Sequence, residues 1–502
     1  MNPSTRNLAG VLDASVDRDQ LAFIGLDSAM RASRYSVGQL DELANAVARG
    51  LLARGYARGE RIAILASNSV EYLAVVLGTM RAGLVSVPVN YKLPRALIEY
   101  VVNDSGARLL LCDQARLALA PDSVDRLMLE GEGPDRLSQL LDPGPLEMFQ
   151  PQGEEPAMIL YTSGSTGKPK GVVLSHAAHL WVVRTRLRAT SLSNERALIA
   201  APFYHMNALA LALLSLASRA TTVLLAQFTA QAYLQAIERY RCTWLTAVPP
   251  MIAMILREPL ESVDLSSVRV VRMGSAPVSA SLLEQIHRLL PNAQVINAYG
   301  TTEGGPVVFA AHPAGLATPP LAVGCAHPEV SLRLRDEQGR ESDQGVLELK
   351  SPGLMSGYHH RPDLASPFTA DGYYVTGDVF HRDAEGFYTF VGRRDDMFVS
   401  GGENIYPGEI EKMLEGHPAV QQACVVPVED EIKGYKPVAF VVLRAQAFAS
   451  EEELKAFSLE HAASYQHPRR IWMLDALPLA GTNKIDRHAL RMRAAQLWKS
   501  QL

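Results

Sequence analysis

The chain alternates between two kinds of hydrophobic pattern. Short runs rich in Val, Ile and Leu are followed by segments in which apolar residues recur every three or four positions. The runs predict buried strands, and the longer segments predict amphipathic helices. Strand–helix alternation of this kind predicts an α/β fold with largely parallel sheets. The strands are predicted at 61–66, 84–89, 157–160, 221–226, 243–248, 268–273 and 294–298, and the helices at 71–83, 230–240 and 279–290.

The pattern changes in the last third of the chain. After about residue 323, strands of alternating polarity are separated by Gly and Asp turns, which predicts a β-rich subdomain. The charged segment 392–396 is typical of a linker, and a mixed unit follows it. We therefore expect a large N-terminal domain of αβ-layered sheets plus a β-rich subdomain at 1–394, and a small α+β domain at 395–502. The strands are predicted at 331–335, 345–350, 386–391, 421–427 and 438–443, and the helices at 409–415 and 451–460.

Composition and charge narrow the class of protein. The 502 residues carry a net charge of −5 without a basic block, so a nucleic-acid partner is disfavoured. The longest apolar run, 208–217, is shorter than the ~20 residues that span a bilayer, and the N-terminus lacks the apolar core of a signal peptide. We expect a cytoplasmic protein without a membrane span. Cys112, Cys242, Cys325 and Cys424 lie far apart and without metal-ligand spacing, which predicts buried reduced thiols.

A glycine-rich segment carries the sharpest chemical signal. Residues 161–171 read YTSGSTGKPKG and follow a predicted strand. Glycines let the backbone turn tightly and bring N–H groups close to an anion, while the hydroxyls and lysines add donors and positive charge. Gly164 and Gly167 are separated by two residues, not by the four of a Walker P-loop. The segment therefore predicts a polyphosphate-binding loop of another kind.

Five further motifs follow in order, and with the loop they resemble the adenylate-forming superfamily of acyl- and aryl-CoA synthetases, nonribosomal peptide adenylation domains and luciferases. The resemblance covers essentially the whole chain. It implies that a carboxylic acid and ATP form an acyl-adenylate and pyrophosphate, and that the acyl group then passes to a thiol, with ATP, Mg²⁺ and CoA taking part. The motifs are NAYGTTEG at 297–304, YVTGD at 374–378, GRRDDM at 392–397, SGGENIYP at 400–407 and GTNK at 481–484.

The resemblance also implies a nucleotide site. Tyr299 would stack on adenine, Thr302 would contact the α-phosphate, Asp378 and Arg393 would hold the ribose, and Glu303 would bind Mg²⁺. The remaining ATP or AMP contacts that it implies are Thr162, Ser163, Gly164, Ser165, Thr166, Gly167, Lys170, Ser275, Ala276, Pro277, Asn297, Ala298, Gly300, Thr301 and Lys484.

Two arrangements of the small domain are implied as well. Lys484 would enter the site during adenylation and withdraw when the mobile C-terminal domain rotates about Asp395, the hinge. Many relatives have glycine where this chain has Asn483, so we expect local differences in that loop. The residues implied to be catalytic are Lys484, Thr162, Thr302, Glu303 and His205.

The acceptor thiol has three interpretations: CoA, a carrier protein, or none in a non-catalytic relative or dedicated adenylate maker. We favour CoA because the loop, Glu303 and Lys484 are intact and the 400–407 motif has the form seen in many CoA ligases. Only 18 residues follow Lys484, so we expect no fused carrier domain. By resemblance, Ser400, Gly401 and Gly402 would border a pantetheine tunnel, and Lys433, Lys436, Arg469 and Arg470 would meet the CoA phosphates.

The motif alignment also implies a set of residues around the acid. These residues are small or apolar, which leaves room for an aromatic ring or an acyl chain. We favour a benzoate- or cinnamate-type acid, with a medium-chain fatty acid as the alternative; the oligomeric state stays open, a homodimer included. No charged side chain is in the set, which disfavours a second charge on the substrate, and Asn207 could meet a ring hydroxyl. The set is His205, Met206, Asn207, Ala247, Ser275, Ala298, Gly300, Gly304, Gly305 and Val307.

Overall fold

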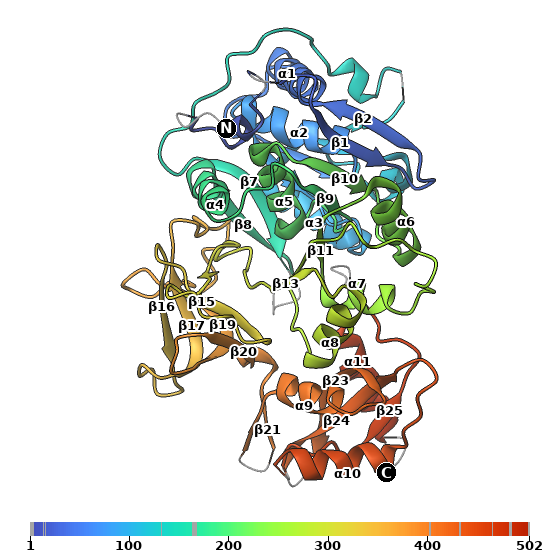
Figure 1. Cartoon of the computed structure of the whole chain (residues 1–502). Helices are drawn as coiled ribbons and strands as arrows, with labels where there is room; N and C mark the ends of the chain where they lie inside the picture. The colour runs from blue at the N-terminus through green and yellow to red at the C-terminus, as the bar shows by residue number, and fades with distance from the viewer. Residues whose placement is uncertain are drawn as a thin grey trace.

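The computed structural model (Figure 1) describes residues 5–13, 15, 17–131, 133–162, 168–400, 403–430, 433–463, 465–480 and 484–499. Its first sheet has the strand order β13-β12-β11-β9-β10-β1-β2, in which all neighbours are parallel except β1 and β2. The strands are β1 (Leu21–Leu26), β2 (Ala32–Ser36), β9 (Arg196–Ile199), β10 (Thr221–Leu225), β11 (Trp244–Ala247), β12 (Val270–Met273) and β13 (Gln294–Asn297).

The second sheet has the order β18-β8-β7-β4-β3-β5-β6, and it is parallel from β7 to β6. Its strands are β3 (Arg61–Leu65), β4 (Val85–Pro88), β5 (Ala107–Cys112), β6 (Asp125–Met128), β7 (Pro156–Thr162), β8 (Lys170–Ser175) and β18 (Gly357–Tyr358). The helices of this part are α1 (Val37–Ala53), α2 (Val70–Arg81), α3 (Arg95–Ser105), α4 (His176–Ala189), α5 (Met206–Ser218), α6 (Ala230–Tyr240), α7 (Pro249–Ile255) and α8 (Ala280–Leu289).

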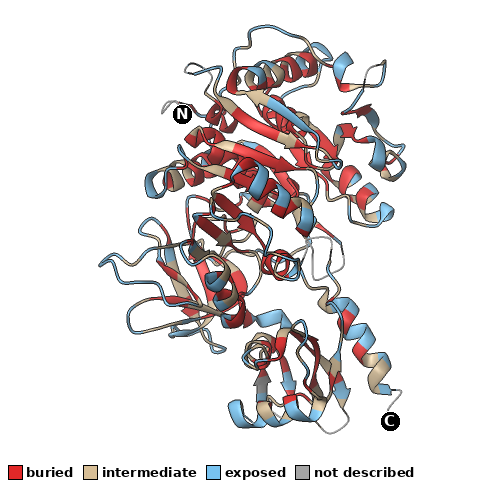
Figure 2. Ribbon diagram, turned by 45° about the vertical axis from the view of Figure 1, so that its right-hand side comes forward, coloured by how far each residue is buried: buried red, intermediate tan, exposed pale blue. Residues whose placement is uncertain are grey.

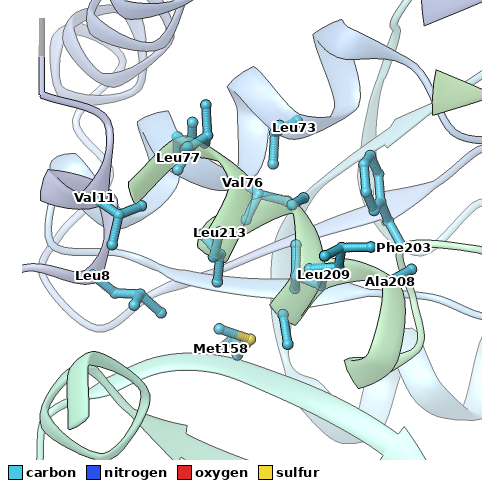
Figure 3. Packing of buried hydrophobic residues seen from close by; sticks show 14 of the residues in the cluster. Leu8, Val11, Leu73, Val76, Leu77, Met158, Phe203, Ala208, Leu209 and Leu213 are labelled. Atoms are coloured by element: carbon cyan, nitrogen blue, oxygen red, sulfur yellow. The ribbon is translucent and has the colours of Figure 1, made fainter. Parts of the chain in front are cut away.

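Helices and sheets alternate in layers. Residues of α6, α7 and α8 pack on one face of the first sheet, and α1, α2, α4 and α5 fill the space between the two sheets. Helix α5 is buried on every side, so its leucines meet α2 and the second sheet together (Figure 3). Figure 2 shows that the strands of these sheets are buried along most of their length. Across the described ranges, no helix is long and apolar enough to cross a membrane.

A third, antiparallel sheet forms the β-rich subdomain, with the order β14-β15-β20-β19-β17-β16. Its strands are β14 (Phe309–Ala310), β15 (Ala322–Ala326), β16 (Ser331–Arg335), β17 (Gln344–Lys350), β19 (Tyr374–Arg382) and β20 (Tyr388–Arg393). The predicted fold class is thereby confirmed for the N-terminal part. All four cysteines are free and buried, as expected.

The C-terminal part has its own core. Its sheet has the order β22-β21-β24-β23 with β25 beside β24, and α9 and α10 cover one face while α11 covers the other. The elements are β21 (Phe398–Ser400), β22 (Glu403–Ile405), α9 (Pro407–Glu415), β23 (Val420–Asp430), β24 (Gly434–Leu443), α10 (Glu451–His461), β25 (Ile471–Met473) and α11 (Arg487–Lys499). The short helix η4 (Arg394–Asp396) precedes this part. The boundary at 394/395 stays a prediction.

Candidate functional site

A cavity of about 840 Å³ lies between the N-terminal sheets and the C-terminal part. Much of its wall comes from turns after parallel strands, the place where α/β sheets bind ligands. Residues 274–277 follow β12, residues 298–303 follow β13, and the start of α5 follows β9. The third sheet adds residues 374–378, and Lys484 closes the cavity from the C-terminal side. Each of the six sequence motifs thus contributes at least one residue to the wall of one cavity.

The glycine-rich segment is the connection between β7 and β8. The antiparallel register pairs Thr162 with Lys170, so both flank the mouth of the segment and both line the cavity. The Thr162 hydroxyl donates a hydrogen bond to Oε1 of Glu303 at 3.3 Å, and Nζ of Lys170 lies 4.8 Å from the centroid of the Tyr358 ring. The predicted phosphate contacts Ser163, Gly164, Ser165, Thr166 and Gly167 lie outside the described residues.

Glu303 is the acidic group closest in sequence to the predicted α-phosphate contact. Its Oε1 also accepts a hydrogen bond from the Tyr358 hydroxyl at 3.2 Å. Among the residues that the structure describes, no cluster of three or more His, Cys, Asp or Glu side chains could hold a metal ion alone. Mg²⁺ commonly binds through one or two carboxylates together with substrate phosphates and water. A single carboxylate on a wall of hydroxyl donors therefore fits Mg²⁺ that arrives with a nucleotide.

Asp378 is buried at the centre of a polar network. Its Oδ2 accepts a hydrogen bond from the Tyr299 hydroxyl, and its Oδ1 lies 3.4 Å from Nη1 of Arg393. Burial raises the pKa of Asp378, and the nearby Arg393 opposes that rise. The Tyr299 ring packs edge to face against Phe380, with ring centroids 4.9 Å apart. The hydroxyl of Tyr299 is thus committed to Asp378, a contact that the sequence did not predict.

Arg393 connects this network to the predicted hinge. Its Nη2 lies 3.8 Å from Oδ2 of Asp395, which sits in η4 with its side chain 59% exposed. Asp395 also lines the cavity. One guanidinium therefore lies between a buried carboxylate of the site and a carboxylate at the start of the C-terminal part.

Lys484 enters the cavity from the segment before α11. A β-bridge pairs Leu479 with Ile485, and the Lys484 carbonyl accepts a hydrogen bond from the Ala480 N–H at 2.7 Å. Desolvation lowers the pKa of Lys484; Asp378 and Glu303 act in the opposite direction, which puts the ammonium within electrostatic range of both carboxylates. The preceding motif residues 481–483, Asn483 included, lie outside the described residues.

A part-buried ion pair anchors the segment that carries Lys484. Both Nη atoms of Arg487 lie 2.6 Å from the Glu411 carboxylate oxygens, and Arg487 Nη1 also donates to the Val425 carbonyl at 3.2 Å. Bidentate pairs of this kind fix geometry as well as charge. The start of α11 is thereby fixed to α9 and β23.

The turns after β12 and β13 lie against each other. A Cβ atom on Gly274 would stand 2.9 Å from the Ala298 carbonyl oxygen, and one on Gly300 would stand 2.8 Å from Cα of Pro306. Ser275 has a φ of +67°. Only glycine permits this approach without displacing backbone. Ser275, Ala276, Pro277, Asn297, Ala298, Thr301 and Thr302 thereby line one continuous wall of the cavity.

Two protein-family models match this chain. The family model of AMP-binding enzymes matches residues 13–359, and the model of the AMP-binding enzyme C-terminal domain matches residues 409–484. The chain belongs to the AMP-binding enzyme family. Feruloyl-CoA synthase from Amycolatopsis sp is 34% identical over 463 residues, which cover 90% of this chain and 93% of that protein. The fatty acid–acyl-carrier-protein ligase ScoC from Streptomyces coeruleorubidus is 33% identical and covers 91% of each chain.

A solved structure of an ATP-bound enzyme also resembles this chain over nearly its whole length. ATP-bound MatB from Rhodopseudomonas palustris superposes with a TM-score of 0.88 at 28% identity, over 98% of this chain and 100% of that one. The resemblance to adenylate-forming enzymes and the two-part fold are therefore confirmed, and so is the enzyme class, an AMP-forming ligase. ATP binding by this AMP-binding enzyme is supported at the same level.

Not all expected acyl-site residues of the AMP-binding enzyme reach the cavity. His205, Met206, Asn207, Ser275, Ala298 and Gly300 line it, whereas Ala247, Gly304, Gly305 and Val307 do not. Ala247 faces away because strand side chains alternate, and it packs with Leu245 against α6 to α8. A Cβ on Gly304 would meet Thr301 and also Leu349 of the third sheet, and one on Gly305 would meet the carbonyl oxygen of Gly353, which follows β17 of that sheet. Val307 is buried, and Pro306 takes its place on the wall.

His205 stands at the start of α5 with Nε2 buried and without a hydrogen-bond partner among the described residues. Burial, together with the charge of Lys484, lowers the pKa of His205 to about 3, so its ring is neutral. Its ring packs edge to face on Tyr204, with centroids 4.5 Å apart. A neutral ring at this point can form a wall or accept a hydrogen bond from a ligand.

Sequence reasoning missed several charged residues of the cavity wall, among them an arginine of the first sheet. Arg272, in the middle of β12, lines the cavity. The expected acyl set thus leaves out a charged side chain of the cavity wall. The signal was present in the predicted strand 268–273, where Arg272 interrupts Val271 and Met273, both buried on the opposite face. A motif alignment cannot detect it, because Arg272 precedes the turn motif.

The CoA candidates of the AMP-binding enzyme gather away from the cavity. Ser400 is buried and pairs with Gly434, while Gly401 and Gly402 lie outside the described residues. Nearby, the Lys433 N–H donates to Asp430, and Nζ of Lys436 lies 2.5 Å from the same carboxylate. Arg469 contacts His467, Arg470 pairs with Glu451, and none of these four cations lines the cavity.

Proposed function

We propose that this enzyme is a carboxylic acid–CoA ligase that converts an acid, ATP and CoA into acyl-CoA, AMP and pyrophosphate through an acyl-adenylate. The observation that carries this proposal is the meeting of Lys484, Glu303, Thr162 and Asp378 around one cavity, from four motifs spread over the chain. The name of the relative feruloyl-CoA synthase supports the same reaction.

In the first half-reaction, a carboxylate oxygen of the acid attacks the α-phosphorus of ATP, a bond to phosphorus forms, and pyrophosphate leaves. The barrier comes largely from the approach of negative charges and from positioning. The Lys484 ammonium offsets the charge at the carboxylate and the α-phosphate, and Thr162 and Lys170 bind the leaving phosphates. Mg²⁺ held by Glu303 supplies further charge neutralisation when bound.

The nucleoside is held by the polar network of Asp378. Its carboxylate accepts hydrogen bonds from the ribose hydroxyls, while Tyr299 and Arg393 fix its two oxygens in place. The wall formed by residues 275–277 and 297–302 receives the adenine and the α-phosphate.

In the second half-reaction, the CoA thiol attacks the acyl carbon and AMP leaves. The C-terminal domain rotates about Asp395, Lys484 withdraws, and residues 400–402 border the pantetheine. Lys433, Lys436, Arg469 and Arg470 meet the CoA phosphates. The contact of Arg393 with Asp395 supports a hinge here, because a surface ion pair of this kind is weak enough to break.

The acid that we favour is aromatic, of the benzoate or cinnamate type. Ala298 and Gly300 line the cavity together with Met206 and His205, and their small size leaves room for a flat ring. The relative named feruloyl-CoA synthase supports this class. A fatty acid passed to a carrier protein is the second candidate, supported by the name of the relative ScoC.

The test is pyrophosphate release across benzoates, cinnamates and straight-chain acids, each with and without CoA. Reactions without ATP and without acid are the controls. Turnover that requires CoA and is highest on aromatic acids is expected. A single burst of pyrophosphate that CoA does not change would contradict CoA as acceptor and point to a carrier protein, and a maximum on straight chains would contradict the aromatic class.

A further inference from the structure

Arg272 points into the space between the first sheet and the helices α4 and α5. Its neighbours Val271 and Met273 pack with α6 to α8 on the other face of the sheet, and strand side chains alternate. In register beside it are Thr246 of β11 and Ile296 of β13. Arg272 is therefore an interior arginine, and the part of it that protein does not cover faces the ligand cavity.

A second arginine approaches from the helix layer. Arg186 lies in the last turn of α4, three and four residues after the buried Val183 and Val182, so it shares their inward face. Desolvation and the positive charge of Arg272 lower the pKa of Arg186, which puts the two guanidiniums within electrostatic range of each other. Arg272 keeps a pKa of about 10, so it stays charged at neutral pH.

Neither guanidinium has an acidic partner in the parts of the chain that the structure describes. No ion pair or hydrogen bond of Arg186 or Arg272 is found there, and no carboxylate contributes to the pKa of either group. Two arginines nearby behave differently: Arg269, at the surface before β12, pairs with Glu195 at 2.9 Å, and Arg188 on α4 pairs with Glu329 at 2.6 Å. The interior pair is thus the exception.

An interior charge without a partner is costly, and two like charges are costlier still. Thr246, which lies beside Arg272, adds a second unsatisfied polar group, because its Oγ1 is buried and has no hydrogen-bond partner in the described chain. Positive charge, unused polar capacity and an open cavity wall meet at one point. A ligand with a negative group would occupy the cavity, pair with the charge of Arg272 and accept a hydrogen bond from the Thr246 hydroxyl.

We propose that the acid substrate carries a second anionic group, a carboxylate remote from the reacting carboxyl, and that Arg272 binds it with Arg186 behind. The inference rests on the proposed ligase reaction and narrows its substrate class to dicarboxylic acids. A planar guanidinium can donate two parallel hydrogen bonds to a carboxylate, so the dianion should bind more tightly than a monoanionic analogue. The remote group takes no part in bond making.

The test compares acids that differ in that group alone. The first pair is 4-carboxycinnamate and its 4-carboxamide, and the second is suberate and its monomethyl ester. For each, kcat/KM is measured from pyrophosphate release with ATP and CoA, and binding is measured by calorimetric titration into protein saturated with AMP. We expect the dianion to exceed its monoanionic partner at least about tenfold in both measurements, as for hydrogen bonds to charged groups.

Two variants assign the preference to the interior pair. Arg272→Met is expected to reduce the ratio of kcat/KM for the dianion to that for the monoanion to near one, and Arg272→Lys is expected to keep part of this preference. Arg269→Met, three residues away and outside the cavity, is the matched control and is expected to keep the full ratio. Without acid, Arg272→Met is also expected to raise the melting temperature, since it removes an unpaired interior charge; an arginine that merely supports the fold would lower it.

The outcomes separate the inference from the function on which it rests. Turnover of the monoanionic acids with no increase in kcat/KM or binding from the second carboxylate would overturn the inference and leave the proposed ligase function intact. Preferential binding of dianions without turnover of any acid would keep the inference and overturn the ligase. Equal binding of both members without turnover would overturn both, and an unchanged ratio in Arg272→Met would overturn the role of Arg272.

Discussion

Tyr299 and Asp378 form a buried hydrogen bond although they lie 79 positions apart in the sequence. The Tyr299 hydroxyl donates to one carboxylate oxygen, and Arg393 stands 3.4 Å from the other. Burial raises the pKa of both groups, so the tyrosine stays protonated and keeps its role as donor. The carboxylate is thus oriented before any nucleotide arrives.

Tyr299→Phe is expected to raise KM for ATP about tenfold while changing kcat less, because one hydrogen bond that orients Asp378 is lost. Steady-state kinetics of pyrophosphate release at varied ATP would measure it. Tyr35→Phe is the control: Tyr35 donates to Glu71 in a similar pair that does not line the cavity. An unchanged KM in Tyr299→Phe would show that Asp378 needs no such support.

Lys484→Ala is expected to lose adenylation by two or more orders of magnitude and to retain the transfer from a supplied acyl-adenylate to CoA, because the ammonium acts on developing charge in the first step only. Both steps are measured separately, by pyrophosphate release and by acyl-CoA formation. Lys499→Ala, on the exposed side of α11, serves as the control. Equal loss of both steps would contradict two domain arrangements.

The alkaline side of the pH profile should report Lys484. Desolvation lowers its pKa below the usual 10.5, and the proposed chemistry needs the charged form, so kcat/KM for ATP is expected to fall at a lower pH than for an ordinary lysine. Lys484→Arg is expected to move that fall to higher pH, because a guanidinium keeps its proton. A profile that the substitution does not shift would assign the alkaline fall to another group.

Glu303→Gln is expected to raise the Mg²⁺ concentration required for half-maximal adenylation about tenfold or more, since an amide oxygen is a weaker ligand for a hard cation than a carboxylate. The measurement is a Mg²⁺ titration at fixed ATP. Tyr358→Phe removes one hydrogen bond to Glu303 and keeps the carboxylate, so a small shift is expected there. An equal shift in both variants would argue that Glu303 is only a structural acceptor.

Much of the fold could be predicted because local pattern and tertiary structure agree. Helix 230–240 begins after the N-cap Thr229 and ends at Tyr240, before the C-cap Arg241, within the limits that the hydrophobic pattern gives. For the strand predicted at 421–427 the end is wrong: β23 runs from Val420 to Asp430, and Pro427 stands opposite Pro437 in its ladder with β24. Such pairing depends on a strand that is distant in sequence.

The residues of the site also divide into those that the sequence predicts and those that only the fold reveals. Thr162, Glu303, Asp378 and Lys484 could be found because each stands in a motif whose residue types report the chemistry. Arg272 could not, because its meaning depends on which face of β12 it occupies and on the arginine that α4 brings toward it. Ala247 was placed in the acyl set by its position in the motif alignment, but an offset of one residue turns a strand side chain to the other face of the sheet.

His179 on α4 should make the fold sensitive to acid. Its ring is buried, and burial lowers its pKa to about 4 from the ordinary 6.5, so the unfolded chain binds a proton that the folded chain does not between these values. The resulting stability is fully present above pH 6.5 and is lost as the pH falls toward 4. Between pH 7 and pH 5, this single group contributes about 2 kcal/mol to the loss in the free energy of unfolding.

His179→Leu is expected to remove that part of the pH dependence at little cost at pH 7, because Nε2 has no hydrogen-bond partner within the described chain. Urea unfolding of the N-terminal domain at pH 7 and pH 5 would measure it. His461→Leu, an exposed site on α10, is the control and should keep the wild-type slope. If the His179 variant kept the full loss at pH 5, other groups would have to account for the acid sensitivity.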